Sequence, residues 1–197
     1  MILYPLASKF VTVKFFMRAT AQQSQHLASR YLKAVVAGVL LLSTQAALAV
    51  AVGDAMPGCA LSPLGDSQTS ALSQYHGKVL YVDFWASWCG PCAQSFPFLN
   101  ELQGQLKDRG LQVVGVNLDE HAEDAKAFLA QNPAQFTIVA DVSKQCARDF
   151  AVKAMPSSYL INRNGKVHHV HLGFRSDEAK ELRQLVEQLL NEKVAGL

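Results

Sequence analysis

The feature that most constrains this fold is a nearly continuous apolar run over residues 78–86, which leads directly into Trp88-Cys89-Gly90-Pro91-Cys92. A run of this length, rich in β-branched and aromatic residues, predicts a strand that is buried on both faces. After Cys92, apolar residues recur at helical spacing and predict a helix that runs to residue 108 and stops at Gly110. The chain therefore places two cysteines where a buried strand gives way to a helix.

The segments around this unit also carry strand and helix patterns. Residues 50–77 are rich in turn residues and should hold one or two short strands; further strands are predicted at 111–118, 136–140, 158–162 and 167–172, and helices at 122–131 and 144–150. Asn164-Gly165 is a strong hairpin signal between the last two strands. A final amphipathic helix should begin with Ser176 as its N-cap. This order predicts an α/β fold, a central mixed β-sheet sandwiched between helices, in one domain of residues 50–197.

Residues 1–49 differ in charge from the rest of the chain. They carry five basic residues and no acidic one, which leaves 13 of the 18 basic side chains against 16 acidic ones elsewhere. A mildly acidic domain gives no reason to expect nucleic acid as a partner. The apolar residues 34–42 lie between Arg30-Tyr31-Leu32-Lys33 and Ala47-Leu48-Ala49, which fits a cleaved signal peptide. An uncleaved membrane anchor over residues 34–52 is the alternative, and either would place the domain outside the cytoplasm, as in the periplasm.

The spacing of Cys89 and Cys92 is that of a redox dithiol. Disulfide exchange needs a thiolate that attacks a sulfur and a second thiol that resolves the mixed disulfide. At a helix start, unpaired N–H groups and the helix dipole favour the Cys89 thiolate, Pro91 loses no hydrogen bond, and Gly90 lets the short ring close. A zinc site would need two more ligands, and haem attachment would need His where Ala93 stands. Redox chemistry without a metal or cofactor is therefore favoured.

Two further cysteines, Cys59 and Cys146, lie far from this pair in the sequence. Four cysteines in an exported protein allow three complete pairings. The close spacing of Cys89 and Cys92 favours a bond between these two, which leaves Cys59 to pair with Cys146. A structural disulfide is one interpretation, two buried thiols that act as small apolar side chains a second, and a secondary electron relay a third.

The segment from Tyr81 to Cys92, with its Trp-Cys-Gly-Pro-Cys motif, resembles the active-site segment of thioredoxins. Residues 54–190 resemble the exported TlpA/ResA branch of that superfamily, whose members are thiol–disulfide oxidoreductases. Asp83 matches the family's buried acid, Met155-Pro156 its cis proline facing the cysteines, and residues 115–119 its central strand. The resemblance implies an enzyme that exchanges disulfides with protein substrates in cell redox homeostasis. It favours a monomeric reductase kept reduced by a membrane electron donor, with cytochrome c maturation as one client pathway.

The matched residues have physical roles in that reaction. Burial should raise the pKa of Asp83, which suits a base that takes the proton from Cys92 through water. A cis bond at Pro156 would leave the Met155 backbone free to pair with a substrate strand. The residues expected to bind substrate are Trp88, Gly90, Pro91, Met155 and Pro156.

Other signals favour simpler interpretations. Ser95 stands where the TlpA/ResA branch often has Glu, so Asp83 is the main candidate for proton transfer. Ser157 replaces the usual Thr and keeps a hydroxyl. Solvated side chains, rather than metal ligands, are expected for His168, His169, His171, Asp119, Glu120, Glu123 and Asp124. The alternative function is a copper carrier on the same fold, which would generally use a wider cysteine pair and a distant His. A thiol peroxidase would need a single reactive cysteine in a different motif.

Overall fold

The computed structural model describes residues 50–66 and 68–192, so the predicted signal peptide or anchor of residues 1–49 lies outside the described residues. Within the described part, no helix is long and apolar enough to cross a membrane. Seven strands of this part form one sheet in the order β2-β1-β5-β4-β3-β6-β7. Their bounds are β1 Ala60–Pro63, β2 Ser70–Ala71, β3 Val79–Trp85, β4 Leu111–Asn117, β5 Thr137–Ala140, β6 Ser157–Ile161 and β7 Val167–Leu172.

The sheet is mixed. Strand β3 lies between β4, which runs parallel to it, and β6, which runs antiparallel. Strand β5 continues the parallel part beside β4, and β7 forms the antiparallel edge beside β6. The central mixed sheet predicted from the sequence is therefore confirmed, and β1 and β2 are the short strands expected before residue 77.

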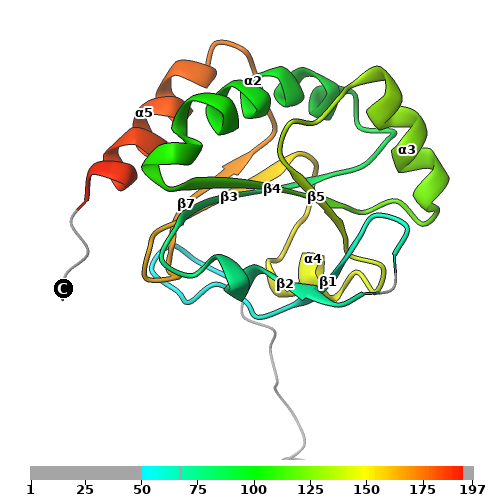
Figure 1. Cartoon of the computed structure of the whole chain (residues 1–197), viewed down its shortest axis with the longest axis horizontal. Coiled ribbons are helices and arrows are strands. Elements are labelled where there is room, and N and C mark those ends of the chain that lie inside the picture. The colour runs from blue at the N-terminus through cyan, green and yellow to red at the C-terminus, as the bar shows by residue number, and fades with distance from the viewer. Residues whose placement is uncertain (1–49, 67, 193–197) are drawn as a thin grey trace, which may run out of the picture. The chain divides into compact units, whose positions relative to one another are not determined.

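Helices cover both faces of the sheet (Figure 1). Three longer helices, α2, α3 and α5, lie on one face, and the short helix α4 lies on the other with β1 and β2 nearby. Their bounds are α2 Gly90–Leu106, α3 Ala122–Gln131, α4 Gln145–Asp149 and α5 Ala179–Asn191, with 3-10 turns at Leu72–Tyr75 and Lys107–Arg109. Gly110 ends the α2 segment with a φ of 100°, as its position in the sequence predicts.

Strand β3 separates two apolar layers, because all seven of its residues are buried and successive side chains point to opposite faces. On the α2 face, Trp85 packs against Phe96 and Phe128, with ring centroids 5.1 and 5.0 Å apart. On the α4 face, Phe84 packs against Phe150 and Tyr159 at 5.2 and 5.7 Å. The cysteine pair belongs to the first layer.

Gly115 in β4 allows the first layer to approach the sheet closely. A Cβ atom at this position would lie 2.9 Å from the Phe136 ring, 3.0 Å from Ile138 Cδ1 and 3.2 Å from Trp85 Nε1. These distances are shorter than ordinary van der Waals contact, so a side chain here would force the aromatic packing beneath α2 to shift.

One predicted boundary is wrong. Ser176 does not cap the last helix; α5 begins at Ala179, and Glu178 is its N-cap residue. Ser176 lies instead in a turn that is closed by the Glu178 N–H, which donates to the Arg175 carbonyl at 3.0 Å. Arg175 also pairs with Asp177 at 3.1 Å within this turn, so local contacts delay the start of the helix by two residues.

Candidate active site

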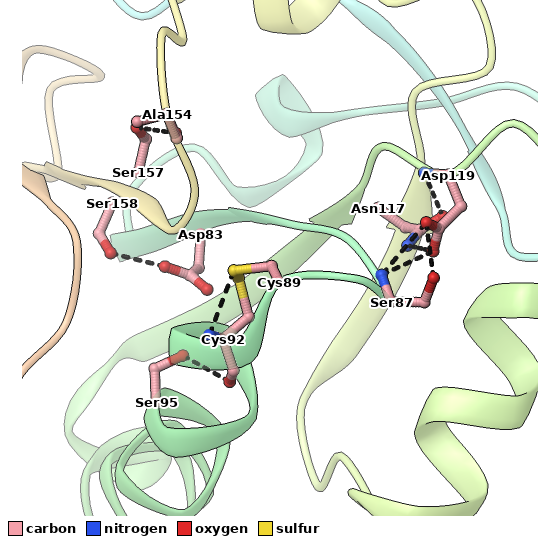
Figure 2. The surroundings of a disulfide bond; sticks show 10 residues. All are labelled: Asp83, Ser87, Cys89, Cys92, Ser95, Asn117, Asp119, Ala154, Ser157 and Ser158. Atoms are coloured by element: carbon pink, nitrogen blue, oxygen red, sulfur yellow. Dashed lines mark hydrogen bonds between the residues drawn. A yellow bond between two sulfur atoms is a disulfide. The ribbon is translucent and has the colours of Figure 1, made fainter.

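The cysteine pair lies at the start of α2. The Cys89 N–H donates to the Ala86 carbonyl at 3.1 Å and closes the turn that follows β3. Cys89 is the N-cap residue, and its sulfur accepts a hydrogen bond from the Cys92 N–H at 3.2 Å. The two residues form a disulfide in this structure (Figure 2), with Cys89 4 % exposed and Cys92 fully buried. A thiolate at Cys89 would therefore accept a backbone hydrogen bond from the helix end that the dipole makes positive.

Asp83 lies on β3 on the same face as this pair and is only 1 % exposed. Its Oδ1 accepts a hydrogen bond from Ser158 Oγ at 2.6 Å, while Oδ2 has no partner among the described residues. Burial raises the pKa of Asp83 to about 7, and the Ser158 hydroxyl offsets only part of that effect. Figure 2 shows the carboxylate beside the start of α2. A buried carboxyl group that is half ionised at neutral pH can both accept and release a proton.

A cis peptide bond joins Met155 to Pro156 in the loop before β6. The Pro156 carbonyl accepts a hydrogen bond from the Gly173 N–H at 2.7 Å, and Ser157 Oγ donates to the Ala154 carbonyl at 2.7 Å. These two bonds hold the loop on both sides. Met155 packs against the apolar cluster that contains the cysteines, and its own amide and carbonyl make no hydrogen bond within the described residues.

The two tryptophans near the pair have opposite environments. Trp88, directly before Cys89, is 71 % exposed, whereas Trp85 is fully buried. Gly90 and Pro91 are also exposed. An exposed indole beside a disulfide offers apolar contact area to a docking protein.

A model of the family named Redoxin matches residues 51–189. The chain belongs to the Redoxin family. Its relatives show further that it is a TlpA/ResA-like member of the thioredoxin superfamily. The thiol–disulfide oxidoreductase ResA of Geobacillus thermodenitrificans is 32% identical over 141 residues, which cover 72% of this chain and 79% of that protein. ResA of Geobacillus kaustophilus is 33% identical over 130 residues, 66% of this chain and 74% of the relative.

Solved structures agree with this assignment. A thiol:disulfide interchange protein of DsbE type from Chlorobium tepidum has a TM-score of 0.69 and 48% identity, and the match covers 73% of this chain and all of that one. A protein disulfide isomerase from Bacteroides thetaiotaomicron has a TM-score of 0.65 and 25% identity, over 73% of this chain and 92% of that one. The thioredoxin-like fold and the disulfide oxidoreductase class of this redoxin are thus shared with its relatives.

Asp119 is a site residue of this redoxin that the sequence did not reveal. It was expected to be solvated, but its carboxylate accepts hydrogen bonds from the Ser87 N–H at 3.0 Å, from Ser87 Oγ at 2.9 Å and from Asn117 Nδ2 at 2.8 Å (Figure 2). Lys144 Nζ donates to the Asp119 carbonyl at 2.8 Å. This network anchors the turn that carries Trp88 and Cys89. The available signal was that Asp119 follows β4, since parallel strands β3 and β4 end at the same edge of the sheet.

Ser95 and Ser158 also differ in what they contact. Ser95 is buried in α2, and its hydroxyl donates to the Cys92 carbonyl at 3.0 Å, so it is occupied by its own helix. Ser158 bonds Asp83 from a strand 75 residues away. Asp83 therefore has one hydrogen-bond partner among the described residues, and the sequence alone gives no reason to select Ser158.

Cys59 and Cys146 form a second disulfide, 87 residues apart in the sequence. Both lie in the apolar layer on the α4 face, whereas Cys89 and Cys92 lie on the α2 face. The sheet therefore separates the two disulfides, and the structure does not bring them together into one site.

The histidines of β7 do not match the expectation of solvated side chains. His168, His169 and His171 are all partly buried. The rings of His169 and His171 stack with centroids 6.2 Å apart, and His171 Nε2 lies 3.3 Å from Glu178 Oε2. For His169 and His171 the reason is that residues of α5 lie beside them at this edge of the sheet. Over residues 50–66 and 68–192, no group of three or more His, Cys, Asp or Glu residues is arranged to hold a metal ion.

Proposed function

We propose that this redoxin reduces disulfides in client proteins outside the cytoplasm, with Cys89 as the attacking thiolate and Cys92 as the resolving thiol. The observation that carries the proposal is the position of Cys89 at the N-cap of α2, where its sulfur accepts the Cys92 N–H. This bond and the helix dipole stabilise a thiolate at Cys89 more than at Cys92. The burial of Cys92 supports its role as the thiol that reacts second, from within the site.

Asp83 acts as the base that takes the proton from Cys92. The supporting observations are its burial on the same face as the pair, the pKa of about 7, and an Oδ2 atom with no partner among the described residues. A base whose pKa lies near the working pH transfers protons most effectively. Removing the proton from Cys92 allows its sulfur to attack the mixed disulfide.

Client proteins bind on the surface formed by Trp88, Gly90, Pro91, Met155 and Pro156. The exposed Trp88 ring supplies apolar contact, and the unpaired backbone of Met155 supports pairing with an extended client segment by strand addition. In this mode main-chain hydrogen bonds supply affinity with little sequence preference. Such binding suits an enzyme that acts on several clients.

The Gly-Pro dipeptide between the cysteines resembles that of reducing thioredoxins, and this resemblance supports electron flow from the enzyme to its clients. The signal peptide predicted over residues 1–49 supports export, and an exported reductase requires an electron donor at the membrane. Cytochrome c maturation is a client pathway of the proposed function, on the resemblance to the TlpA/ResA branch. Cys59 and Cys146 serve as a structural cross-link that ties the segment before β1 to α4.

The equilibrium reduction potential of the Cys89–Cys92 pair tests the proposal. We expect a value nearer the reducing limit of about −270 mV than the oxidising limit of about −120 mV, measured against glutathione. A value near the oxidising limit would make the enzyme an oxidase. Cys89→Ser should abolish insulin reduction, whereas Cys92→Ser should accumulate the mixed disulfide with the client. Tight copper binding by a protein that does not reduce insulin would favour the metal carrier instead.

A further inference from the structure

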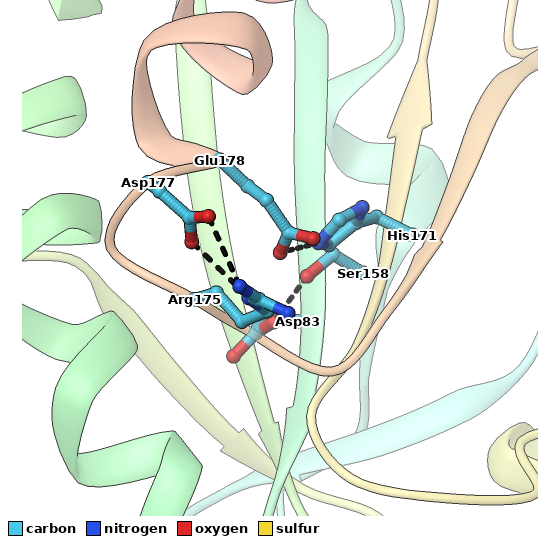
Figure 3. Close-up of polar contacts among 6 residues, drawn as sticks. All are labelled: Asp83, Ser158, His171, Arg175, Asp177 and Glu178. Atoms are coloured by element: carbon cyan, nitrogen blue, oxygen red, sulfur yellow. Dashed lines mark hydrogen bonds and ion pairs between the residues drawn. The ribbon is translucent and has the colours of Figure 1, made fainter.

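A row of polar side chains crosses three strands from the core toward the surface. Asp83 on β3 is the register partner of Ser158 on β6, and Ser158 is the register partner of His171 on β7. Register partners point to the same face of a sheet, with Cβ atoms about 5 Å apart. Glu178, just before α5, continues the row, because its Oε2 lies 3.3 Å from His171 Nε2 (Figure 3). Polar side chains thus follow one another from the buried carboxylate to the outer edge of the sheet, with a hydrogen bond between Asp83 and Ser158 and register neighbourhood alone between Ser158 and His171.

Exposure increases along this row. Asp83 is 1 % exposed and Ser158 5 %, while the side chains of His171 and Glu178 are 18% and 36% exposed. A cavity of about 250 Å³ lies at the outer end, lined by His169, His171, Glu178, Glu181, Leu182 and Leu185. A cavity of this size with polar walls admits water. His171 therefore borders a space that water can enter.

The other neighbours of Asp83 offer no comparable connection. Its register partner on β4 is Gly115, which has no side chain. Trp85 Nε1 can only donate a hydrogen bond. Burial and the charge of Asp83 raise the pKa of Tyr81, and its interaction with Ser158 offsets this only in part, so the Tyr81 hydroxyl keeps its proton. Among the described residues, Ser158 alone is hydrogen-bonded to the carboxylate.

We propose that Ser158 and His171 carry the proton between Asp83 and solvent during disulfide exchange, an inference that rests on the proposed role of Asp83. When the dithiol is oxidised, Cys92 gives its proton to Asp83, and its thiolate attacks the Cys89 sulfur of the mixed disulfide. The Cys89–Cys92 bond forms, the bond to the client breaks, and the client leaves as a thiolate that takes a proton from solvent. Once Asp83 is protonated it donates to Ser158 Oγ, the Ser158 hydroxyl turns from the carboxyl group to His171, and it passes its own proton to the ring as it takes the one from Asp83. His171 releases a proton to solvent, and each step reverses in the opposite direction.

The surroundings of His171 suit this role. A neutral imidazole has one nitrogen that accepts a proton and one that donates a proton, so the His171 ring can receive a proton on one side and release one on the other. The uncharged Ser158 and Leu160 face this part of β7 from β6. The titratable groups near His171 are Glu178, Glu181, His169 and the exposed Arg175–Asp177 pair.

His171→Leu tests the path, and His169→Leu is its matched control. His169 lies on the same strand and face, lines the same cavity, and has the apolar Leu160 as its register partner. The rate of oxidation of the reduced enzyme by oxidised glutathione is followed in weak buffer through the fluorescence of Trp85 and Trp88. His171→Leu and Ser158→Ala should slow the proton-coupled step roughly tenfold to a hundredfold, and His169→Leu less than about twofold. Added imidazole should restore the rate of His171→Leu and leave that of Ser158→Ala slow.

Asp83→Asn separates this inference from the proposed function. If Asp83→Asn loses the pH dependence of oxidation while His171→Leu and His169→Leu react equally fast and ignore imidazole, the proton path is overturned and the role of Asp83 stands. If Asp83→Asn keeps the wild-type pH dependence, both fail. If thermal melts show that His171→Leu loses structure, Ser158→Ala still tests the proton path, because it removes only a single oxygen atom from a buried strand.

Discussion

Replacing Asp83 with asparagine should stabilise the fold by an amount that depends on pH. Burial raises the pKa of Asp83 from 3.8 to about 7 in the folded chain. Between these values the folded state holds a proton that the unfolded state has released, so the free energy of unfolding falls as the pH rises. The contribution is complete below about pH 4 and lost above about pH 7. A pKa difference of about 3 corresponds to about 4 kcal/mol, at about 1.4 kcal/mol for each pH unit.

Urea unfolding of the oxidised protein, with both disulfides intact, measures this effect. Asparagine has nearly the shape of aspartate without its charge, so Asp83→Asn should match the wild type at about pH 4 and exceed its free energy of unfolding by about 4 kcal/mol at about pH 8. Other groups titrate alike in both proteins, so their contributions cancel in the comparison.

Asp141→Asn is the matched control, because Asp141 is also fully buried but accepts a hydrogen bond on each oxygen, from Ser143 Oγ at 3.2 Å and the Ala147 N–H at 2.8 Å. Losing an acceptor there should lower the free energy of unfolding by about 1–3 kcal/mol. An Asp83→Asn variant that gains equally at both pH values, or gains nothing at the higher one, would refute the reasoning.

Three further changes test the fold and the site. Gly115→Ala should lower the free energy of unfolding by about 1–3 kcal/mol in urea, because its Cβ has no room, whereas Gly104→Ala, in open space on α2, should raise it by up to about 1 kcal/mol. Replacing Cys59 and Cys146 together with alanine should cost about 4–5 kcal/mol through the loss of an 87-residue cross-link and leave insulin reduction intact; a loss of activity with unchanged stability would point to a redox role. Asp119→Ala should slow disulfide exchange roughly tenfold to a hundredfold, because the turn before the attacking cysteine loses its anchor. An unchanged rate would show that the turn holds its position alone.

The sequence predicts the elements of this fold well because their signals are local. The apolar run of β3, the helical spacing after Cys92 and the Asn164-Gly165 turn each depend on a few neighbouring residues, and each element is present within one or two residues of its expected bounds. The error at Ser176 has the same origin. A serine before an amphipathic stripe is a good N-cap signal, but the Arg175–Asp177 contact and the turn closed by Glu178 compete with it.

The polar contacts of the site are less predictable because they depend on strand register. Asp83 and Ser158 are 75 residues apart, and a shift of β6 by one residue would turn Ser158 to the other face of the sheet. Asp119 bonds Ser87 across 32 residues for a similar reason, since it depends on how the ends of β3 and β4 align. A motif can identify the reacting cysteines, whereas the groups that hold the turn and the carboxylate follow only from the paired sheet.

The burial of Asp83 has opposite consequences for stability and for chemistry. The same desolvation that costs the fold about 4 kcal/mol above pH 7 places the pKa of the carboxyl where it can take a proton from a thiol. An additional hydrogen bond, made to Oδ2, would stabilise the fold when Asp83 is ionised. It would also lower the pKa of Asp83 and occupy the one carboxyl oxygen that has no partner among the described residues. The single bond from Ser158 is therefore a compromise, because it holds the carboxylate in place and leaves its basicity high. In Asp83→Asn, the gain in stability and the loss of proton transfer should appear over the same pH range, because both have one cause.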